Sequence, residues 1–302
     1  MAGPRFGAHM SIAGGLPLAV DRAAAHGCDA LQIFTKNASQ WRGRPLGPDE
    51  VRTFRRRVEE SRIAPVVSHA SYLINLAARD RALRQRSLDA MGDEIDRAEA
   101  LGLLGVVLHP GASTHGDVAG GLDLVGDALA GLLAARGRGT TMVLLEQTAG
   151  QGSSLGSSFE EIAAILGRVN GHRRVGVCLD TCHLLAAGYD IASKAGVLAT
   201  FRAFDRVIGF DRLRVVHAND SRKPCGSRVD RHAHIGEGFV GLEGFRHIVN
   251  DRRIAGLPVL LETPKAAGRG RPAPPAAIDA YDERNLAVLR SLMAPRARRR
   301  RA

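Results

Sequence analysis

The sequence has few cysteines, few lysines and no long apolar run, and the first and the last of these shortages each exclude a class of protein. Four cysteines in 302 residues form neither a CxxC pair nor a paired framework, which excludes a disulfide-stapled domain and a cysteine zinc knuckle. We interpret Cys28, Cys178 and Cys182, in or beside apolar runs, as buried free thiols. No apolar stretch approaches the roughly 18 residues of a membrane span. The N-terminus lacks the basic segment and apolar core of a signal peptide, so we expect a cytoplasmic protein without membrane contact.

The positive charge of the chain comes almost entirely from arginine. Lysine occurs only at positions 36, 194, 223 and 265, although the formal net charge is +11. A basic chain of this kind indicates a polyanionic partner such as nucleic acid. Genome composition can produce the same arginine bias, so charge alone does not decide between the two explanations.

Eight short apolar runs dominate the pattern of the sequence. They are rich in Val, Leu and Ile, which is typical of parallel strands buried on both faces. The runs cover residues 6–9, 30–36, 65–69, 105–109, 142–146, 175–180, 214–217 and 258–262. Helices are predicted between or after them at residues 16–26, 48–62, 80–101, 121–136, 158–168, 195–209, 241–251 and 276–291. Eight strand–helix units predict an α/β protein with a (β/α)8 TIM barrel.

The length fits one such barrel. We expect residues 1–293 to form a single domain, since a (β/α)8 barrel needs about 250 residues before loop insertions. Residues 266–277 are rich in Gly, Pro and Ala and are predicted to form a loop. Residues 294–302 are rich in arginine and are predicted to be a disordered tail, with an electrostatic arm on DNA as the alternative.

Each apolar run ends in a polar residue that is able to bind a metal or catalyse. These residues are His9, Lys36, His69, His109, Glu146, Asp180, His217 and Glu262. The C-terminal ends of barrel strands all face one active site, so the eight side chains are expected to meet at one mouth. A single histidine there would be structural. Six potential ligands at equivalent strand ends predict a metal centre instead.

Two polar motifs extend this set. In GVCLDTCH, His183 follows Asp180 by three residues as the chain turns into a helix. In RVDRHAHIGEG, residues 228–238, Asp230 and His232 alternate along an extended segment and face the same way. By itself this segment would be interpreted as a solvated loop, but with His183 it is able to form a third metal site. The nine candidates include no cysteine, and this mixture of imidazoles and carboxylates favours catalytic zinc.

Loops after the second and third strands have the composition of DNA contacts. Tyr72 and Leu73, in HASYLINL at residues 69–76, form an aromatic–aliphatic pair that is able to wedge between bases. The alternative for Tyr72 and for Trp41 is packing against the barrel rim. The polar candidates for DNA contact, in FTKNASQW at residues 34–41 and in the loop at 228–238, are Lys36, Asn37, Gln40, Arg228 and Arg231.

Seven motifs in a fixed order carry a resemblance to a known family. They are HASYLINL, LHPG at 108–111, EQTAGQGSSLG at 146–156, GVCLDTCH, HANDS at 217–221, GSRVDRHAHIGEG and LLET at 260–263. Together they resemble endonuclease IV, the zinc-dependent family of apurinic/apyrimidinic endonucleases, from about Gly7 to Thr263. The resemblance implies a (β/α)8 barrel with three zinc ions per chain, with manganese left open at one position.

The resemblance also implies how the ligands are shared. One ion would be held by His69, His109 and Glu146, and the third ion by His183, Asp230 and His232. Glu146 would bridge to a second ion that is completed by Asp180, His217 and Glu262. We assign Glu146 and Glu262 as the catalytic residues of this set.

The activity implied by the resemblance is DNA repair. A hydroxide attacks the phosphate 5′ to an abasic site and leaves a 3′-hydroxyl and a 5′-deoxyribose phosphate. Blocked 3′ ends are trimmed as well, so the expected partner is damaged double-stranded DNA and the expected state is a monomer. Tyr72 and Leu73 would flip the abasic nucleotide out of the helix. Gln147, where Asn is common, and Ser39, where some relatives have Arg, depart from the family pattern without touching the nine ligands.

Two other functions are weighed against this one. A sugar isomerase or epimerase on the same barrel also uses Glu, Asp and His around a divalent metal, but it has no use for Asp230 and His232 or for a wedge at Tyr72 and Leu73. The other is a basic DNA-binding protein with an inert barrel, in which metal removal would change nothing.

Overall fold

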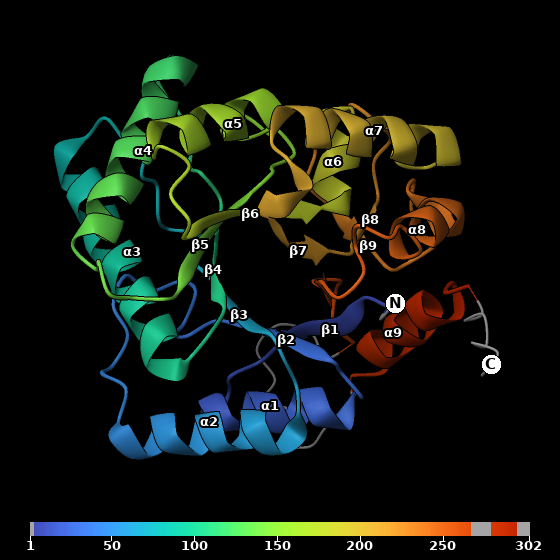
Figure 1. Cartoon of the computed structure of the whole chain (residues 1–302), viewed down its shortest axis with the longest axis horizontal. Helices are drawn as coiled ribbons and strands as arrows, with labels where there is room; N and C mark the ends of the chain where they lie inside the picture. The colour runs from blue at the N-terminus through green and yellow to red at the C-terminus, as the bar shows by residue number, and fades with distance from the viewer. Residues whose placement is uncertain (1–2, 267–278, 295–302) are drawn as a thin grey trace, which may run out of the picture.

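Eight parallel strands close into a barrel that is ringed by helices (Figure 1). The computed structural model describes residues 3–266 and 279–294. Around the barrel the strands follow one another as β1 (Arg5–Met10), β10 (Pro258–Leu261), β7 (Leu213–His217), β6 (Val175–Asp180), β5 (Met142–Glu146), β4 (Gly105–Leu108), β3 (Val66–His69) and β2 (Ala30–Ile33). The prediction of an α/β TIM barrel is confirmed. The single-domain boundary at residue 293 stays a prediction.

The helices follow the strands in chain order and cover the outside of the barrel (Figure 1). They are α1 (Leu16–Ala25), α2 (Pro48–Ser61), α3 (Arg81–Leu101), α4 (Val118–Ala134), α5 (Phe159–Arg168), α6 (Thr181–Ala187), α7 (Lys194–Val207), α8 (Gly241–Val249) and α9 (Ala280–Ser291). Several of these helices begin at a residue whose side chain caps the first turn. The carboxylate of Asp80, for example, accepts a hydrogen bond of 2.7 Å from the amide of Leu83 and so caps the first turn of α3.

Three differences from the predicted elements concern the mouth of the barrel. Strand β2 ends at Ile33, three residues before the predicted end at Lys36. The short helix α6 begins at Thr181, directly after β6. A separate two-stranded antiparallel sheet joins β8 (Asp220–Ser221) to β9 (His232–Ala233). The predicted tail beyond residue 294 and the Pro-rich loop from residue 267 lie outside the described residues.

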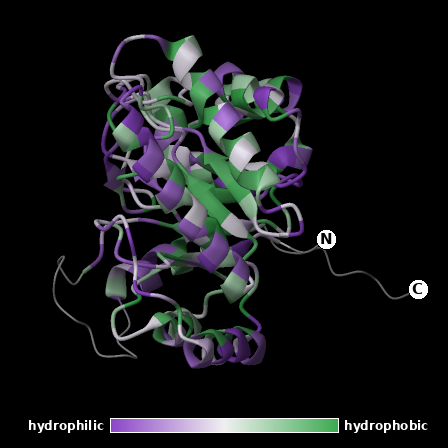
Figure 2. Cartoon of the chain, turned by 90° about the vertical axis from the view of Figure 1, so that its left-hand side faces the viewer, coloured by the Kyte–Doolittle hydropathy of each residue, from purple (hydrophilic) through white to green (hydrophobic). Residues whose placement is uncertain are grey.

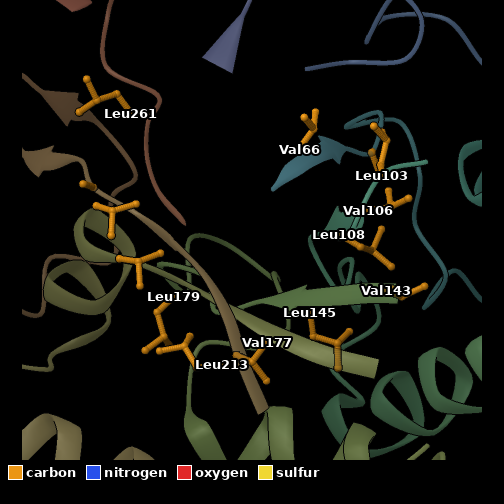
Figure 3. Close-up of a cluster of buried hydrophobic side chains, with 14 of the residues drawn as sticks. Val66, Leu103, Val106, Leu108, Val143, Leu145, Val177, Leu179, Leu213 and Leu261 are labelled. Carbon is orange, nitrogen blue, oxygen red and sulfur yellow. The ribbon is translucent and has the colours of Figure 1, made fainter. Parts of the chain in front are cut away.

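The main core lies between the barrel and the helices. Apolar side chains on the outer face of the strands pack there against the helices, and Figure 2 shows the hydrophobic strands inside the more polar helices. Figure 3 shows part of this cluster, with Val106, Leu108, Val143 and Leu145 on the neighbouring strands β4 and β5. Burial of each such side chain contributes roughly 1.5–3 kcal/mol, so the strand ends stand on a rigid frame. Within residues 3–266 and 279–294, no helix combines the length and apolar character needed to cross a membrane.

Candidate metal centre

Side chains that face into the barrel form two layers, because successive residues of each strand point alternately inward and outward. Residues two apart on a strand face the same way. The first layer is apolar and fully buried, and it consists of Ala30, Val67, Val107, Leu144, Cys178, Val215 and Leu260. Two residues further along, on or directly after the same strands, come Gln32, His69, His109, Glu146, Asp180, His217 and Glu262. A polar layer therefore lies on an apolar floor, at the ends of the strands.

The first ligand cluster joins β3, β4 and β5. The Nε2 atoms of His69 and His109 lie 3.2 and 3.0 Å from Oε2 of Glu146. One ligand atom from each residue lies within 4.8 Å of the others. Glu146 and His69 are buried, whereas His109 is partly open to the mouth. These three residues are brought together as predicted for one ion.

The second cluster uses the other oxygen of Glu146. Its Oε1 lies 2.9 Å from Nδ1 of His217, and the same nitrogen lies 3.4 Å from Oε2 of Glu262 and 3.9 Å from Oδ2 of Asp180. These four residues also have ligand atoms within 4.8 Å of one another. Because the two oxygens of Glu146 face different imidazoles, this carboxylate has the geometry of a bridge.

The third cluster lies at the rim and depends on local structure. Oδ2 and Oδ1 of Asp230 lie 3.3 Å from Nε2 of His183 and 3.2 Å from Nε2 of His232. His183 is positioned because the side chain of Asp180 caps α6 by accepting a 3.0 Å hydrogen bond from the His183 amide. His232 is positioned by the pairing of β9 with Ser221 in β8. All nine predicted ligands therefore meet in three adjoining clusters.

Opposite charges shift the acid–base properties of the cluster. Burial lowers the pKa of His183, but the negative charge of Asp180 and a hydrogen bond with Asp230 raise it to about 10. The pKa of His232 likewise rises to about 9 against burial, because of the same two carboxylates. Burial raises the pKa of Glu146, yet the imidazoles around it hold that pKa well below its ordinary value. Buried carboxylates and imidazole nitrogens thus converge as a divalent cation requires, and the N and O donors fit zinc.

Main-chain carbonyls fix the orientation of three of the imidazoles. The Nδ1 atoms of His69, His183 and His232 lie 2.8, 2.9 and 3.1 Å from the carbonyl oxygens of Ala70, Gln147 and Glu262. A carbonyl oxygen only accepts, so each Nδ1 donates to the main chain and each Nε2 is the nitrogen that faces the carboxylates. A metal ion would take the place of the Nε2 proton, and the bond from Nδ1 would then be the outer hydrogen bond of a metal-binding histidine.

Two thiols adjoin the clusters without joining the predicted ligand set. Cys178 lies near Glu146 and His217, and Cys182 lies near Asp180 and His232. Burial raises the pKa of both thiols to about 12. The interpretation of Cys178 and Cys182 as buried free thiols is confirmed.

Tyr72 covers the first cluster from outside. The residue is 62% exposed, and its ring lies 5.1 Å from the ring of His69 and 5.7 Å from that of His109, measured between centroids. Phe34 supports it edge-on at 5.9 Å. Leu73 beside it is half-buried. The tyrosine thus combines contact with the rim and exposure to solvent, so both interpretations of it remain compatible with the structure.

The chain is similar to characterised families over nearly its whole length. Residues 20–289 match a family model described as "Xylose isomerase-like TIM barrel". A "Probable endonuclease 4" of Chloroflexus aurantiacus is 48% identical over 290 residues, which cover 96% of this chain and 98% of the relative. Endonuclease IV from Thermus thermophilus, whose crystal structure is known, is 39% identical in sequence. The two structures match with a TM-score of 0.82 over 96% of this chain and 98% of the Thermus chain. The chain belongs to the endonuclease IV family.

Membership of the endonuclease IV family confirms the resemblance seen in the motifs and makes the chain a hydrolase of the nuclease type. The same barrel also occurs in sugar-converting enzymes. A D-psicose 3-epimerase is 14% identical with a TM-score of 0.68, and covers 95% of this chain and 97% of that chain. At this identity the likeness shows the fold alone.

One DNA contact expected in this endonuclease IV chain is not supported by the structure. The ammonium group of Lys36 lies 2.7 Å from Glu94 and 3.0 Å from Asp93 of α3, and the side chain is 2% exposed. The reason is the early end of β2, after which the chain turns and directs Lys36 toward α3 rather than the mouth. Thr35 reinforces this attachment by donating to Glu94 at 2.8 Å. We therefore leave Lys36 out of the proposed DNA contacts.

The other expected DNA contacts of the endonuclease IV fold lie at the surface. Asn37 and Gln40 are exposed on the loop after β2, and Arg228 and Arg231 are exposed on the segment that leads to β9. Trp41 is half-buried under the guanidinium of Arg86, at 4.5 Å from its ring centroid, which favours the packing interpretation for that residue.

Sequence reasoning missed one residue of the mouth. Gln32 is fully buried and faces His217 and Glu262. His9, which is expected at the mouth as a strand end, does lie there, 3.6 Å from Glu262. A signal for Gln32 is present in the strand alternation, since it stands two residues after the inward Ala30, as His69 stands two after Val67.

Proposed function

We propose that this chain cleaves double-stranded DNA by hydrolysing the phosphodiester 5′ to abasic sites. The products would be a 3′-hydroxyl and a 5′-deoxyribose phosphate, and blocked 3′ ends would be trimmed at the same site. A trinuclear zinc centre would serve the reaction. The observation that carries the proposal is the convergence of nine ligands into three adjoining clusters, two of which share Glu146.

The residues that would hold the metals follow from the clusters. His69, His109 and Glu146 would hold one ion, and His183, Asp230 and His232 another. Glu146, Asp180, His217 and Glu262 would hold the ion between them. When bound, zinc supplies Lewis-acid stabilisation of the phosphate oxygens and lowers the pKa of a water molecule toward neutrality.

The chain's own residues have separate tasks in this proposal. Glu146 belongs to both of the first two clusters, with one oxygen facing His109 and the other facing His217, and would hold an ion in each. Arg228 and Arg231 lie exposed beside the rim cluster, where guanidinium groups suit the phosphates that flank the lesion. Tyr72 lies exposed over the first cluster with the half-buried Leu73 next to it in sequence, and the two side chains would fill the space of the displaced nucleotide. Asn37 and Gln40 would contact the DNA from the neighbouring loop.

A sugar epimerase remains the alternative, since the barrel is shared with such enzymes. Two features favour the nuclease. The rim cluster adds a third set of ligands beyond the one or two metals of an epimerase, and Tyr72 is exposed over the first cluster, where an epimerase has no use for a wedge residue.

The deciding experiment is incision of a duplex that contains one tetrahydrofuran abasic analogue, with metal analysis of the same preparation. The analogue does not undergo β-elimination, so any cut is hydrolytic. Cleavage on its 5′ side together with about three zinc ions per chain supports the proposal. Protein that is loaded with zinc yet leaves the duplex intact, and that turns over a ketose, would overturn it in favour of the epimerase.

A further inference from the structure

Gln32 lies in the same polar layer as the predicted ligands but belongs to none of the ligand sets. It lies on β2, one of the two barrel strands that contribute none of the nine predicted ligands, and it is fully buried. Its side-chain amide contacts three groups of the mouth. The amide nitrogen donates to Oε1 of Glu262 and lies 3.0 Å from Nδ1 of His9, and the amide oxygen lies 2.8 Å from Nε2 of His217.

The chemistry of Glu262 determines which way this amide faces. A carboxylate only accepts hydrogen bonds, so the NH2 group of Gln32 must be the part that faces it. The amide oxygen then faces His217, and an amide oxygen also only accepts. Nε2 of His217 therefore donates to Gln32, and Nδ1 is the nitrogen that faces the ligand carboxylates. Nδ1 lies 2.9 Å from Oε1 of Glu146, to which it donates, and 3.4 Å from Oε2 of Glu262. A metal ion bound by these carboxylates would take the place of the Nδ1 proton.

This orientation is opposite to that of the other imidazoles with an outer hydrogen bond. His69, His183 and His232 donate from Nδ1 to main-chain carbonyls and turn Nε2 toward the carboxylates. A main-chain carbonyl is present whatever the side chain. For His217 the acceptor is a side chain, so a single substitution is able to remove it.

We infer that Gln32 is the positioning residue of the middle cluster: its amide orients His217 to bind metal through Nδ1 and Glu262 to bind through Oε2. This inference rests on the proposed metal centre. One planar group sets both ligands, because its oxygen and nitrogen lie on opposite sides of the same amide. Outer hydrogen bonds of this kind typically contribute 10- to 100-fold to metal affinity.

The test compares Gln32→Met with the parent and with Gln85→Met. Methionine has nearly the volume of glutamine and fills the buried site without a donor or a strong acceptor. Gln85 is an exposed residue of α3 that bonds Asp89, so its variant makes the same chemical change far from the mouth. Each zinc-loaded protein is titrated with a chelator while the metal retained per chain is measured. Ring nitrogen NMR of histidine-labelled protein then reports which nitrogen of His217 carries the proton.

We expect Gln32→Met to release one zinc ion at a roughly 10- to 100-fold lower chelator concentration than the parent, while Gln85→Met behaves as the parent. We also expect the parent to show one zinc-bound histidine protonated at Nε2, and Gln32→Met to lose that signature. The thermal midpoint of the metal-free variant should stay near that of the parent, which separates a positioning effect from misfolding.

Two results would overturn the inference for different reasons. A variant that retains every ion as firmly as the parent, with an unchanged Nε2 signature, shows that Gln32 only fills space. A parent that binds no zinc removes the metal centre itself, and the proposed function falls with it. If Gln32→Met does not fold, Gln32→Glu serves instead: it keeps an oxygen toward His217 but repels Glu262, so the inference requires it to lose the same ion.

Discussion

The ligands at the strand ends and those at the rim are held by different kinds of structure. Glu146, Asp180 and His217 are fully buried and belong to adjacent barrel strands, where the register of the sheet sets their spacing. Asp230 is 39% exposed and His232 is 18% exposed, and both belong to a segment joined to the barrel through a two-residue strand pairing. The inner ligands are therefore a property of the barrel, and the rim ligands a property of a local segment.

This difference predicts how each part responds to change. Moving an inner ligand requires movement of a strand whose outer face is packed against helices, so the geometry there is stiff. The rim segment has few buried apolar side chains and depends on individual hydrogen bonds, such as the 3.0 Å bond from the Asp230 amide to Gln151. We expect the rim ion to exchange first, and the inner ions to determine whether any reaction occurs.

Removing the bridging carboxylate should have the largest effect. In Glu146→Gln the amide keeps the shape of the side chain but loses the charge that two clusters share. We expect incision of abasic DNA to fall on the order of 10³-fold or more, with two zinc ions lost rather than one. Metal analysis and single-turnover incision measure both effects, and circular dichroism checks the fold.

The matched control is Glu60→Gln, the same substitution at an exposed glutamate of α2. It should leave metal content and incision unchanged. Full zinc occupancy with normal cleavage in Glu146→Gln would refute the bridging role and remove the distinction between the inner and rim clusters.

Removing the rim carboxylate should have a smaller and more local effect. In Asp230→Asn, His183 and His232 lose the carboxylate that lies between them. We expect loss of one zinc ion, retention of the other two, and a roughly 10²-fold fall in incision. Mild chelation of the parent should first produce the same partially loaded state. Loss of all three ions from Asp230→Asn would mean that the rim and the inner clusters form one cooperative unit.

A substitution of the exposed tyrosine tests how the protein recognises DNA next to the inner ligands. Tyr72 contacts the inner ligands His69 and His109 through its ring but is itself open to solvent. Tyr72→Ala should weaken binding to abasic duplex about 10-fold, because base–aromatic stacking contributes roughly 1–3 kcal/mol, and it should affect undamaged duplex much less. Fluorescence anisotropy with the two duplexes measures this ratio. Equal losses on both would assign Tyr72 to packing, and Tyr72→Phe should keep the parent ratio if stacking is the cause.

Barrel strands and their end residues are predictable from this sequence because both follow from local patterns. Buried parallel strands give continuous apolar runs, and a period of two carries each run directly to the residue at the mouth. His69, Glu146 and Asp180 are predicted in this way, and the structure brings them together. The rim cluster requires a further step, since Asp230 and His232 are convincing only beside His183.

The sequence does not show where strand β2 ends, and this affects the predictions for Lys36 and Gln32. The apolar run at 30–36 continues past the last residue of β2, so the pattern predicts its terminal Lys36 at the mouth and passes over Gln32. Only the tertiary structure shows that the carboxylates of Asp93 and Glu94 lie close enough to form ion pairs with Lys36. A glutamine between two metal ligands is also not recognisable from the sequence, because glutamine occurs in many other structural environments.

The salt dependence of DNA affinity distinguishes an exposed basic residue from a buried one, and this is the smallest effect that we expect. Each phosphate contact that is lost lowers the slope of log affinity against log salt by about 1. Arg231 is exposed beside the rim cluster, so Arg231→Ala should lower that slope by about one unit and weaken binding to any duplex. Lys36 is buried against Asp93 and Glu94, so Lys36→Met should lower the thermal midpoint through the unpaired carboxylates but leave the slope unchanged. Binding isotherms at several salt concentrations measure both slopes. A reduced slope in Lys36→Met would show that the lysine leaves its partners to meet DNA, and the burial seen in the free protein would then describe one state of a moving loop.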